Sequence, residues 1–211
     1  MTGLRVRKKE EARRRIIHAA AQLFADRGID ATTMEEVAAA ADVSVATVYT
    51  YFGSKTVLLV AGVEDDAEAM LAEGAAVLAR PGTDPRRAVK KLLRIYLEHL
   101  TAWDRHLLRE VMGAMFQPGG DELATGLAQT DERLIAQLTE LLEHFRSRGA
   151  LHPAVASPEA ALLLFSTVVT HLFIFLSLES YTPARLTSQV TRQIDLAFHG
   201  LAAPDQKANR T

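Results

Sequence analysis

The sequence predicts an all-α protein, and three observations support this fold class. Apolar residues recur every three or four positions over long segments, as they do in helices with one buried face. No stretch shows sustained alternation of apolar and polar residues bounded by hairpin turns, as strands would. The 211 residues are 48% hydrophobic, which is enough for a sizeable core in one large or two modest domains.

The first helix is expected over residues 10–27 and ends at Gly28, which suits a C-cap. Its apolar positions should cover the two helices that follow; these positions are Ile16, Ala20, Leu23 and Phe24. Residues 1–9 are expected to form a flexible basic arm. Two interpretations of this arm remain open, a contact along DNA and a frayed terminus.

Residues 32–55 are the segment around which the rest is organised. Thr32 and Glu35 have the spacing of a capping box, which predicts the start of a short helix. That helix should stop at Asp42 and Val43, and Ser44 can cap a second helix that runs to Phe52. Two short helices joined by a tight turn are typical of a helix-turn-helix, whose second helix enters the major groove of DNA.

The second short helix should bury Val48 and Phe52 and turn a small, hydroxylated and aromatic face outward. Hydroxyls can bond phosphates or base edges, and small apolar groups can contact the thymine methyl. Lys55 opposes the dipole of its own helix and therefore has better reason to point at a phosphate. The candidate DNA-binding residues are Thr33, Ser44, Val45, Ala46, Thr47, Tyr49, Thr50, Tyr51 and Lys55. The alternative to DNA binding is a solvent-exposed three-helix corner whose hydroxyls serve only as helix caps.

A set of residues at fixed spacing carries a family resemblance: Ala20, Leu23, Phe24, Gly28, Thr32, Thr33, Ala38, Ala41, Val43, Ser44, Thr47, Tyr49, Tyr51, Phe52, Ser54, Lys55 and Leu58. Residues 13–59 resemble the N-terminal domain of TetR-type (TetR/AcrR) transcriptional regulators. The resemblance implies that the helix from Ser44 reads DNA and that Thr33 and Lys55 touch phosphates. It also implies that Tyr49 and Tyr51 reach the DNA backbone or nearby bases. Position 45 is often basic in such proteins and position 34 sometimes is, so Val45 and Met34 leave the operator sequence open.

The remaining chain is expected to be helical as well. The predicted helices are 54–79, 85–103, 104–116, 121–148, 158–179 and 183–198. We predict a helix-turn-helix DNA-binding domain at 1–53, a helical ligand-binding and dimerisation domain at 54–203, and a disordered tail at 204–211.

The segment 158–179 is the most hydrophobic, and its length approaches that of a membrane span. His171 and several hydroxyls interrupt it, and neither flank carries a basic cluster. Burial between the body and a second subunit is therefore favoured over a membrane. The resemblance implies a homodimer through the last two long helices, about 158–179 and 183–198.

The resemblance also implies a small-molecule inducer between the middle helices, and a mostly apolar cavity would suit a hydrophobic or aromatic compound. The candidate ligand-binding residues are Tyr96, His99, Trp103, Met112, Phe116, His171 and Phe175. The same spacing is typical of an ordinary core, and His171 would also suit an interface histidine that bonds across the two-fold axis.

Composition and the absence of certain motifs exclude several kinds of chemistry and several classes of protein. The absence of cysteine excludes disulfides and thiolate chemistry and is compatible with the cytoplasm. His18 and Gln22 interrupt the apolar run that a signal peptide would need. The sequence contains no compact histidine cluster, so a metal site is not expected. It also contains no nucleophile elbow and no phosphate-binding glycine loop, so neither an enzyme nor a cofactor is expected. Residues 1–60 carry a net charge of +2 on a chain of net −2, which suits DNA contact at one pole.

The function predicted from the sequence is a ligand-responsive transcriptional repressor. It would bind a pseudo-palindromic, double-stranded DNA operator as a homodimer, in the cytoplasm and without a membrane partner. The alternative is a helical dimeric binding module for a small molecule or a protein, without specific DNA reading.

Overall fold

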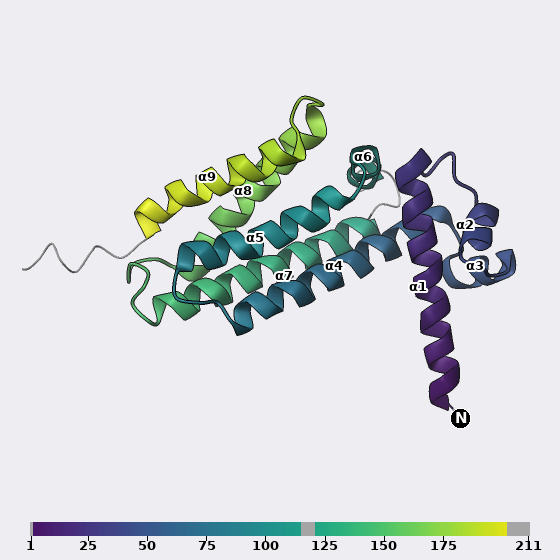
Figure 1. Cartoon of the computed structure of the whole chain (residues 1–211), viewed down its shortest axis with the longest axis horizontal. Coiled ribbons are helices and arrows are strands. Elements are labelled where there is room, and N and C mark those ends of the chain that lie inside the picture. The colour runs from purple at the N-terminus through teal and green to yellow at the C-terminus, as the bar shows by residue number, and fades with distance from the viewer. Residues whose placement is uncertain (1, 115–120, 202–211) are drawn as a thin grey trace, which may run out of the picture. The chain divides into compact units, whose positions relative to one another are not determined.

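A computed structural model describes residues 2–114 and 121–201 of the chain. These residues form nine α-helices and no strand, which confirms the predicted all-α class (Figure 1). The helices are α1 Thr2–Arg27, α2 Met34–Ala40, α3 Val45–Phe52, α4 Lys55–Ala79, α5 Pro85–Ala102, α6 Arg105–Ala114, α7 Asp121–Arg146, α8 Ser157–Ser177 and α9 Pro183–Leu201.

The predicted helices all exist, and their ends differ from the predictions by up to three residues except at the N-terminus. The helix predicted to end at residue 116 is described only to Ala114, because residues 115–120 lie outside the described part. The tail predicted at 204–211 also lies outside it. Asp104 caps α6, since its Oδ1 accepts from the backbone N–H of His106 at 2.8 Å.

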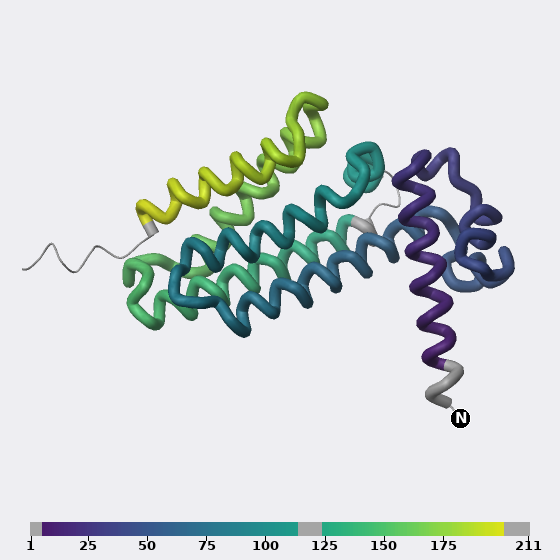
Figure 2. The backbone as a smooth tube through the Cα atoms, viewed as in Figure 1, coloured from purple at the N-terminus to yellow at the C-terminus, as the bar shows by residue number. Residues whose placement is uncertain are grey.

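The start of the chain corrects one prediction. A flexible arm was expected at residues 1–9, but α1 begins at Thr2 instead of residue 10. The coloured part of α1 extends without a break through residues 6–9 (Figure 2). Arginine and lysine make up half of residues 2–9 and are good helix formers, and no proline interrupts them. The helix therefore propagates from its packed C-terminal half into solvent.

The chain divides into two compact units. Met1–Glu68 with Trp103–Gly126 forms the N-terminal unit, and Ala69–Ala102 with Leu127–Thr211 forms the C-terminal unit. The first unit therefore contains α1–α3, the start of α4 and all of α6. The domain boundary expected after residue 53 stays a prediction.

The N-terminal unit is built on the apolar stripe of α1. Ile16, Ala20 and Phe24 are buried there, as are Val37 of α2 and Val48 of α3. Gly28 ends α1 with φ of 82°, a left-handed conformation that glycine adopts without a steric penalty. The predicted C-cap is thereby confirmed.

The C-terminal unit packs the second part of α4 with α5, most of α7, α8 and α9. Leucines of α5 and α7 fill its centre: Leu92, Leu93, Leu97, Leu138, Leu141 and Leu142 are all buried. At the surface, Lys90 of α5 forms an ion pair with Asp195 of α9. The hydrogen bond from Lys90 lowers the pKa of the Asp195 carboxyl below its usual value, so this pair ties α9 to α5 at neutral pH.

α8 has two unlike faces. Its inner face is buried and includes Leu164, Val168, His171 and Phe175. Its outer face exposes large apolar side chains: Leu162, Leu163, Val169 and Phe173. By length and composition α8 could also cross a membrane, but 44% of its most apolar window is buried inside the unit.

A polar chain crosses the middle of the C-terminal unit. The buried Tyr96 hydroxyl of α5 donates to Gln137 Oε1 of α7 at 2.8 Å, and Gln137 Nε2 donates to the Leu71 carbonyl of α4 at 2.8 Å. Burial raises the pKa of the Tyr96 phenol, so the donor stays protonated. Gly74 of α4 leaves room for Gln137, because a Cβ at this position would lie 2.3 Å from Gln137 Oε1.

We predict that Gly74→Ala destabilises the protein by about 1–3 kcal/mol, because the added methyl group displaces Gln137 from its bonds. The matched control is Gly113→Ala in α6, where a Cβ meets nothing within 4 Å. That change should be neutral or stabilise by up to about 1 kcal/mol, since alanine favours a helix over glycine. Urea unfolding of both variants measures the difference, and equal effects would contradict the role of Gly74.

Candidate nucleic-acid interface

The first short helix starts one residue later than predicted. Thr33, not Thr32, is its N-cap: Thr33 Oγ1 accepts from the Glu36 N–H at 3.2 Å, and Glu36 Oε2 accepts from the Thr33 N–H at 2.9 Å. The predicted capping box of Thr32 with Glu35 is therefore wrong by one position. The bond from the Thr33 N–H lowers the pKa of the Glu36 carboxyl, so the box is charged at neutral pH.

Thr32 does not cap α2 but stabilises the turn between α1 and α2. It is fully buried, and its hydroxyl donates to the Gly28 carbonyl at 2.8 Å. This bond satisfies a carbonyl at the end of α1 that has no partner within the helix. Thr32 therefore fixes the turn between α1 and α2, and the next residue takes the capping role.

The turn into α3 follows the prediction. Asp42 stands at φ of 53°, a left-handed conformation that aspartate tolerates better than most residues. Ser44 caps α3, since its Oγ accepts from the Thr47 N–H at 3.1 Å. Val48 and Phe52 are buried as expected. The helix-turn-helix geometry thus comes from two capped helices around one turn.

The outward face of α3 is uncharged and accessible. Tyr49 is 49% exposed, and Ser44, Ala46 and Thr50 are exposed, while Val45, Thr47 and Tyr51 are half-buried. The hydroxyls are satisfied locally: Thr50 donates to the Ala46 carbonyl at 2.7 Å, and Ser44 and Thr47 share a bond of 2.7 Å. Each hydroxyl keeps acceptor capacity and can rotate toward a base or a phosphate.

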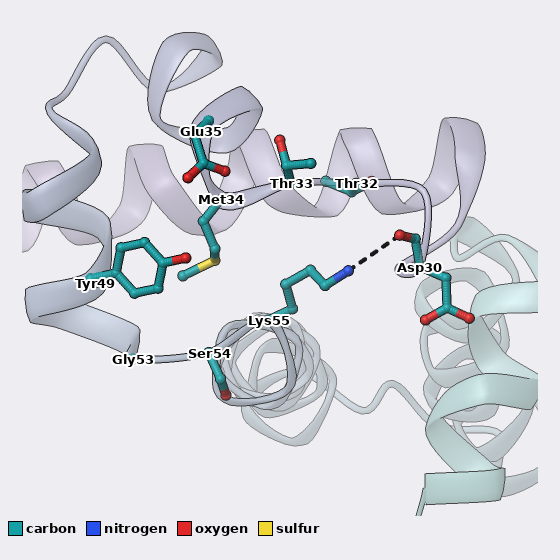
Figure 3. A pocket seen from close by; sticks show the side chains of 9 residues that line it. All are labelled: Asp30, Thr32, Thr33, Met34, Glu35, Tyr49, Gly53, Ser54 and Lys55. Carbon is teal, nitrogen blue, oxygen red and sulfur yellow. Dashed lines mark hydrogen bonds between the residues drawn. The ribbon is translucent and has the colours of Figure 1, made fainter.

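Lys55 lies at an open hollow of about 400 Å³ between α2, α3 and the start of α4 (Figure 3). Its ammonium donates to the carbonyls of Ile29 and Asp30, at 2.8 and 3.3 Å. A lysine ammonium has three donors, so one N–H stays available to a further acceptor. The hollow is lined by Asp30, Thr32, Thr33, Met34, Glu35, Tyr49, Gly53, Ser54 and Lys55.

The structure therefore brings together three of the predicted contacts, Thr33, Tyr49 and Lys55, from three different elements around one hollow (Figure 3). The carbonyl bonds also explain why a cation is tolerated at the N-terminus of α4, where it opposes the helix dipole. The Lys55 ammonium and the hydroxyls of Thr33 and Tyr49 are groups that can bind a phosphate, but the carboxylates of Asp30 and Glu35 also line the hollow and oppose an anion there.

Tyr51 contacts the protein itself. Its hydroxyl donates to the Lys9 carbonyl of α1 at 3.3 Å, and the Lys9 Nζ lies 5.8 Å from the centroid of its ring. Arg13, one turn further along α1, forms an ion pair of 2.9 Å with Asp65 of α4. Sequence reasoning missed both contacts. The available signal was that Lys9 and Arg13 fall on the same side of α1 as the buried Ile16.

The predicted ligand-binding residues are divided between the units. Trp103 and Met112 belong to the N-terminal unit, where the Trp103 indole donates to Asp66 at 2.9 Å. Tyr96, His99, His171 and Phe175 belong to the C-terminal unit. Phe116 lies outside the described residues.

Within the C-terminal unit each of the polar candidates has its own partner. Tyr96 bonds to Gln137, His99 Nε2 lies 3.3 Å from Glu73, and His171 Nδ1 lies 2.6 Å from the Tyr181 hydroxyl. Sequence reasoning missed Gln137 and Tyr181. Gln137 had a signal, because it is a polar residue inside the leucine stripe of α7. Tyr181 had none, since it stands in the connection before α9.

His171 is the candidate with unused bonding capacity. It is only 6% exposed, its ring stacks on Tyr181 at an interplanar angle of 9°, and its Nε2 is buried without a hydrogen-bond partner. Burial also raises the pKa of the Tyr181 phenol. A polar group of a ligand would satisfy Nε2. For metals, the described residues contain no group of three or more potential ligands in a suitable arrangement.

Two capped short helices held against a longer one, with an exposed polar face and a lysine at the edge, define the class of helix-turn-helix DNA-binding proteins. The comparisons refine this class. Residues 16–61 match the family model of bacterial regulatory proteins, tetR family. The chain thus has the DNA-binding domain and the fold of the TetR family of transcriptional regulators, which confirms the resemblance noted in the sequence.

Solved structures with this fold span almost the whole chain. A TetR-family regulator of Mesorhizobium loti is 20% identical, with 92% of this chain and 98% of that chain covered and a TM-score of 0.72. FadR of Thermus thermophilus, a repressor in complex with lauroyl-CoA, is 24% identical, with coverages of 94% and 100% and a TM-score of 0.63. SmeT in complex with triclosan is 20% identical, with coverages of 92% and 93% and a TM-score of 0.70. SmeT is the repressor of the multidrug efflux pump SmeDEF of Stenotrophomonas maltophilia.

No curated protein sequence matches the chain. TetR-type transcriptional regulators are not enzymes, in agreement with the expectation from the sequence.

Proposed function

We propose that the chain is a cytoplasmic, homodimeric transcriptional repressor that binds a pseudo-palindromic operator and is released by a small hydrophobic or aromatic ligand. The observation that carries the proposal is the exposed, uncharged face of α3, held by the Ser44 cap beside Lys55. Such a face can read bases through hydroxyls and methyl contacts, while Lys55 and Thr33 meet phosphates. Two copies would present their α3 helices about 34–36 Å apart, or at a multiple of that distance.

We predict that Thr47→Val and Tyr49→Phe, which remove a hydroxyl and keep the shape, weaken operator binding by about 1–3 kcal/mol. Binding to random duplex DNA should change much less. Lys55→Ala should weaken binding to both duplexes and flatten the salt dependence, because a phosphate contact carries no sequence information. The loss of its bonds to the Ile29 and Asp30 carbonyls should add a further loss on the operator, since these bonds position α3. Fluorescence anisotropy measures the affinities, with fragments from the region upstream of the chain's own gene as the first source of an operator. Equal losses on operator and random DNA would remove Thr47 and Tyr49 from base reading.

A second candidate is a dimeric binding module without specific DNA reading. The observation in its favour is that α3 carries no charged residue. Val45 also stands at a position that is often basic in the family that the sequence resembles, and Met34 at one that sometimes is. This candidate predicts ligand binding without preference for any genomic fragment. The anisotropy measurements decide between the two.

The outer face of α8 supports the homodimer. Leu162, Val169 and Phe173 follow each other at helical spacing, and Phe173 is 71% exposed. The hydroxyls on this side do not make it polar, because Ser166, Thr170 and Ser177 donate to carbonyls of their own helix. A contiguous apolar face of this kind is typical of an interface. The inner face is already packed within the unit, which favours a second copy over a membrane as its cover.

We predict that Phe173→Glu weakens the dimer by about 2–4 kcal/mol, since a buried aromatic residue at an interface centre is a typical hot spot. Val57→Glu on α4 is the control, because Val57 is also an exposed apolar residue, at 49%. Analytical ultracentrifugation should show a shift to monomer for the first variant alone. A wild-type chain that is monomeric at all concentrations would contradict the homodimer.

The proposed ligand site lies in the C-terminal unit. Its core is apolar, and the groups that could orient a ligand there are Tyr96 with Gln137, and His171 with its unused Nε2. A few polar groups in apolar surroundings are typical of small-molecule sites. The ligands named for similar structures, lauroyl-CoA and triclosan, each combine an apolar part with a polar part and are suitable first probes.

We predict that a probe of this kind lowers the affinity for operator DNA by about 5–150-fold, corresponding to a coupling of about 1–3 kcal/mol. By linkage, DNA must lower the affinity for the probe by the same factor. Anisotropy with and without the probe and calorimetry with and without DNA measure the two factors. A probe that binds tightly and leaves DNA affinity unchanged would contradict its role as inducer.

A further inference from the structure

His171 of α8 has a buried polar atom that the described part of the chain does not satisfy. The side chain is 6% exposed, and its Nε2 has no hydrogen-bond partner among the described residues. The neighbouring hydroxyls on the helix are already used, because Thr167 and Thr170 donate to carbonyls of α8 itself. A buried polar atom without a partner lowers stability, so a group that satisfied Nε2 would be bound favourably.

The other ring nitrogen decides what kind of group that is. His171 Nδ1 lies 2.6 Å from the Tyr181 hydroxyl, a distance that is usual for a hydroxyl donor, at about 2.5–3.0 Å, and short for an N–H donor, at about 2.7–3.2 Å. Burial raises the pKa of the Tyr181 phenol, so the phenol keeps the proton that it donates. A neutral imidazole that accepts at Nδ1 carries its own proton on Nε2, and a protonated imidazole carries one there as well. Nε2 is therefore a donor that needs an acceptor.

The direction of the ring places that acceptor inside the C-terminal unit. The exposed apolar residues Leu162, Val169 and Phe173 lie about 160–180° around α8 from His171. A second copy packed on those residues would therefore not reach Nε2. The residues of α8 that share the side of His171 are buried and apolar; they are Leu164, Val168 and Phe175. A molecule bound beside Nε2 would lie along these side chains and needs an apolar body.

The charges near the pair favour an anion. Arg185 of α9 lies over the Tyr181 ring, with its Cζ 5.2 Å from the ring centroid. The charges of Arg185 and Arg192 oppose the effect of burial on the pKa of the Tyr181 phenol, so both guanidinium groups act on this part of the unit. A positive local potential stabilises an anionic acceptor more than a neutral one and repels a cation.

We infer that His171 Nε2 donates a hydrogen bond to the carboxylate of the ligand, and that the ligand is an otherwise apolar carboxylic acid. Tyr181 is a positioning residue, because it holds the imidazole with its donor on Nε2. The inference rests on the proposed function for the existence of a small-molecule site. It goes beyond that proposal by naming the polar group of the ligand and the atom that recognises it.

The test measures binding of three probes with one apolar chain and different ends to the full-length protein, by calorimetry near neutral pH and below the micelle concentration of each probe. Decanoate supplies a charged acceptor, methyl decanoate supplies a neutral acceptor, and decylamine supplies a cation that can only donate. Wild-type protein should bind decanoate about 10–150-fold more tightly than decylamine, as expected for one hydrogen bond to a charged group. Methyl decanoate should lie between the two.

The variants assign this preference to one atom. His171→Phe should lower the affinity for decanoate by about 10–150-fold and leave that for decylamine nearly unchanged. His171→Gln should restore part of the preference, because the amide of glutamine supplies an N–H donor. The matched control is His199→Phe, which removes an imidazole from an exposed position of α9 in the same unit and should bind like wild type.

A further variant keeps the test valid if His171→Phe folds poorly. The double variant His171→Phe with Tyr181→Phe removes Nε2 together with the hydrogen bond between the two side chains. Its ligand-free form should be at least as stable to urea as wild type, since replacing both partners of a buried bond by apolar groups can be nearly neutral and the unsatisfied atom is gone. It should also lose the preference for decanoate. A double variant that keeps the preference would overturn the inference.

Three other results would overturn the inference. They are equal wild-type affinities for decanoate and decylamine, a methyl ester that binds as tightly as the acid, and a His171→Phe variant that keeps the wild-type preference. The first would be expected if a buried water satisfied Nε2, and the second if the ligand were a neutral carbonyl compound.

The outcomes separate this inference from the proposed function. Wild-type protein that is released from operator by triclosan but does not prefer decanoate would leave the repressor proposal standing and reject the carboxylate. Wild-type protein that prefers decanoate through His171 but binds no genomic fragment specifically would reject the repressor and support the carboxylate site.

Discussion

The DNA-binding unit depends on how the end of α1 is closed. The last carbonyls of a helix have no partners within it, and here they and the following turn meet two side chains from elsewhere. The Thr32 hydroxyl donates to the Gly28 carbonyl, and the Lys55 ammonium donates to the carbonyls of Ile29 and Asp30. These bonds connect α1, the start of α2 and the start of α4. They set the position of α2 against α1 and thereby the direction in which α3 leaves its turn.

The C-terminal unit differs from the N-terminal unit in that polar side chains lie inside its apolar core. A buried polar group without a partner costs about 1–3 kcal/mol of stability. Replacing both partners of a buried hydrogen bond by apolar groups of the same shape, in contrast, can be nearly neutral. The chain from Tyr96 through Gln137 to the Leu71 carbonyl is satisfied, and Gly74 is needed to accommodate it. His171 Nε2 is not satisfied. The two groups therefore differ: the first stabilises the packing of α4, α5 and α7, and the second leaves one buried acceptor or donor unused.

Most helices and several helix ends could be predicted from the sequence, because the patterns that specify them lie within a few neighbouring residues. Apolar periodicity gave the helices, and Ser44 and Gly28 marked ends that the structure confirms. The capping box was misplaced because Thr32 and Thr33 both have a carboxylate three residues later, and only burial of Thr32 decides between them. The prediction of a flexible arm is wrong because exposed charge is common to frayed ends and to solvated helices, and the sequence alone does not distinguish them. Contacts such as Tyr51 with Lys9, or Tyr181 with His171, join residues whose proximity depends on packing, and no local pattern encodes them.

The absence of charged residues from α3 has a consequence for the proposed DNA binding. Binding to DNA derives much of its strength from cations that replace counterions along the phosphates, and α3 offers none. Its hydroxyls and aromatic rings can distinguish bases but would hold the duplex weakly on their own. Lys55 has two of its three donors occupied by carbonyls, so it adds at most one strong contact. The remaining charge available beside α3 is that of α1, which Tyr51 holds in place. If α3 reads bases as proposed, most of the electrostatic affinity would therefore come from cations outside α3.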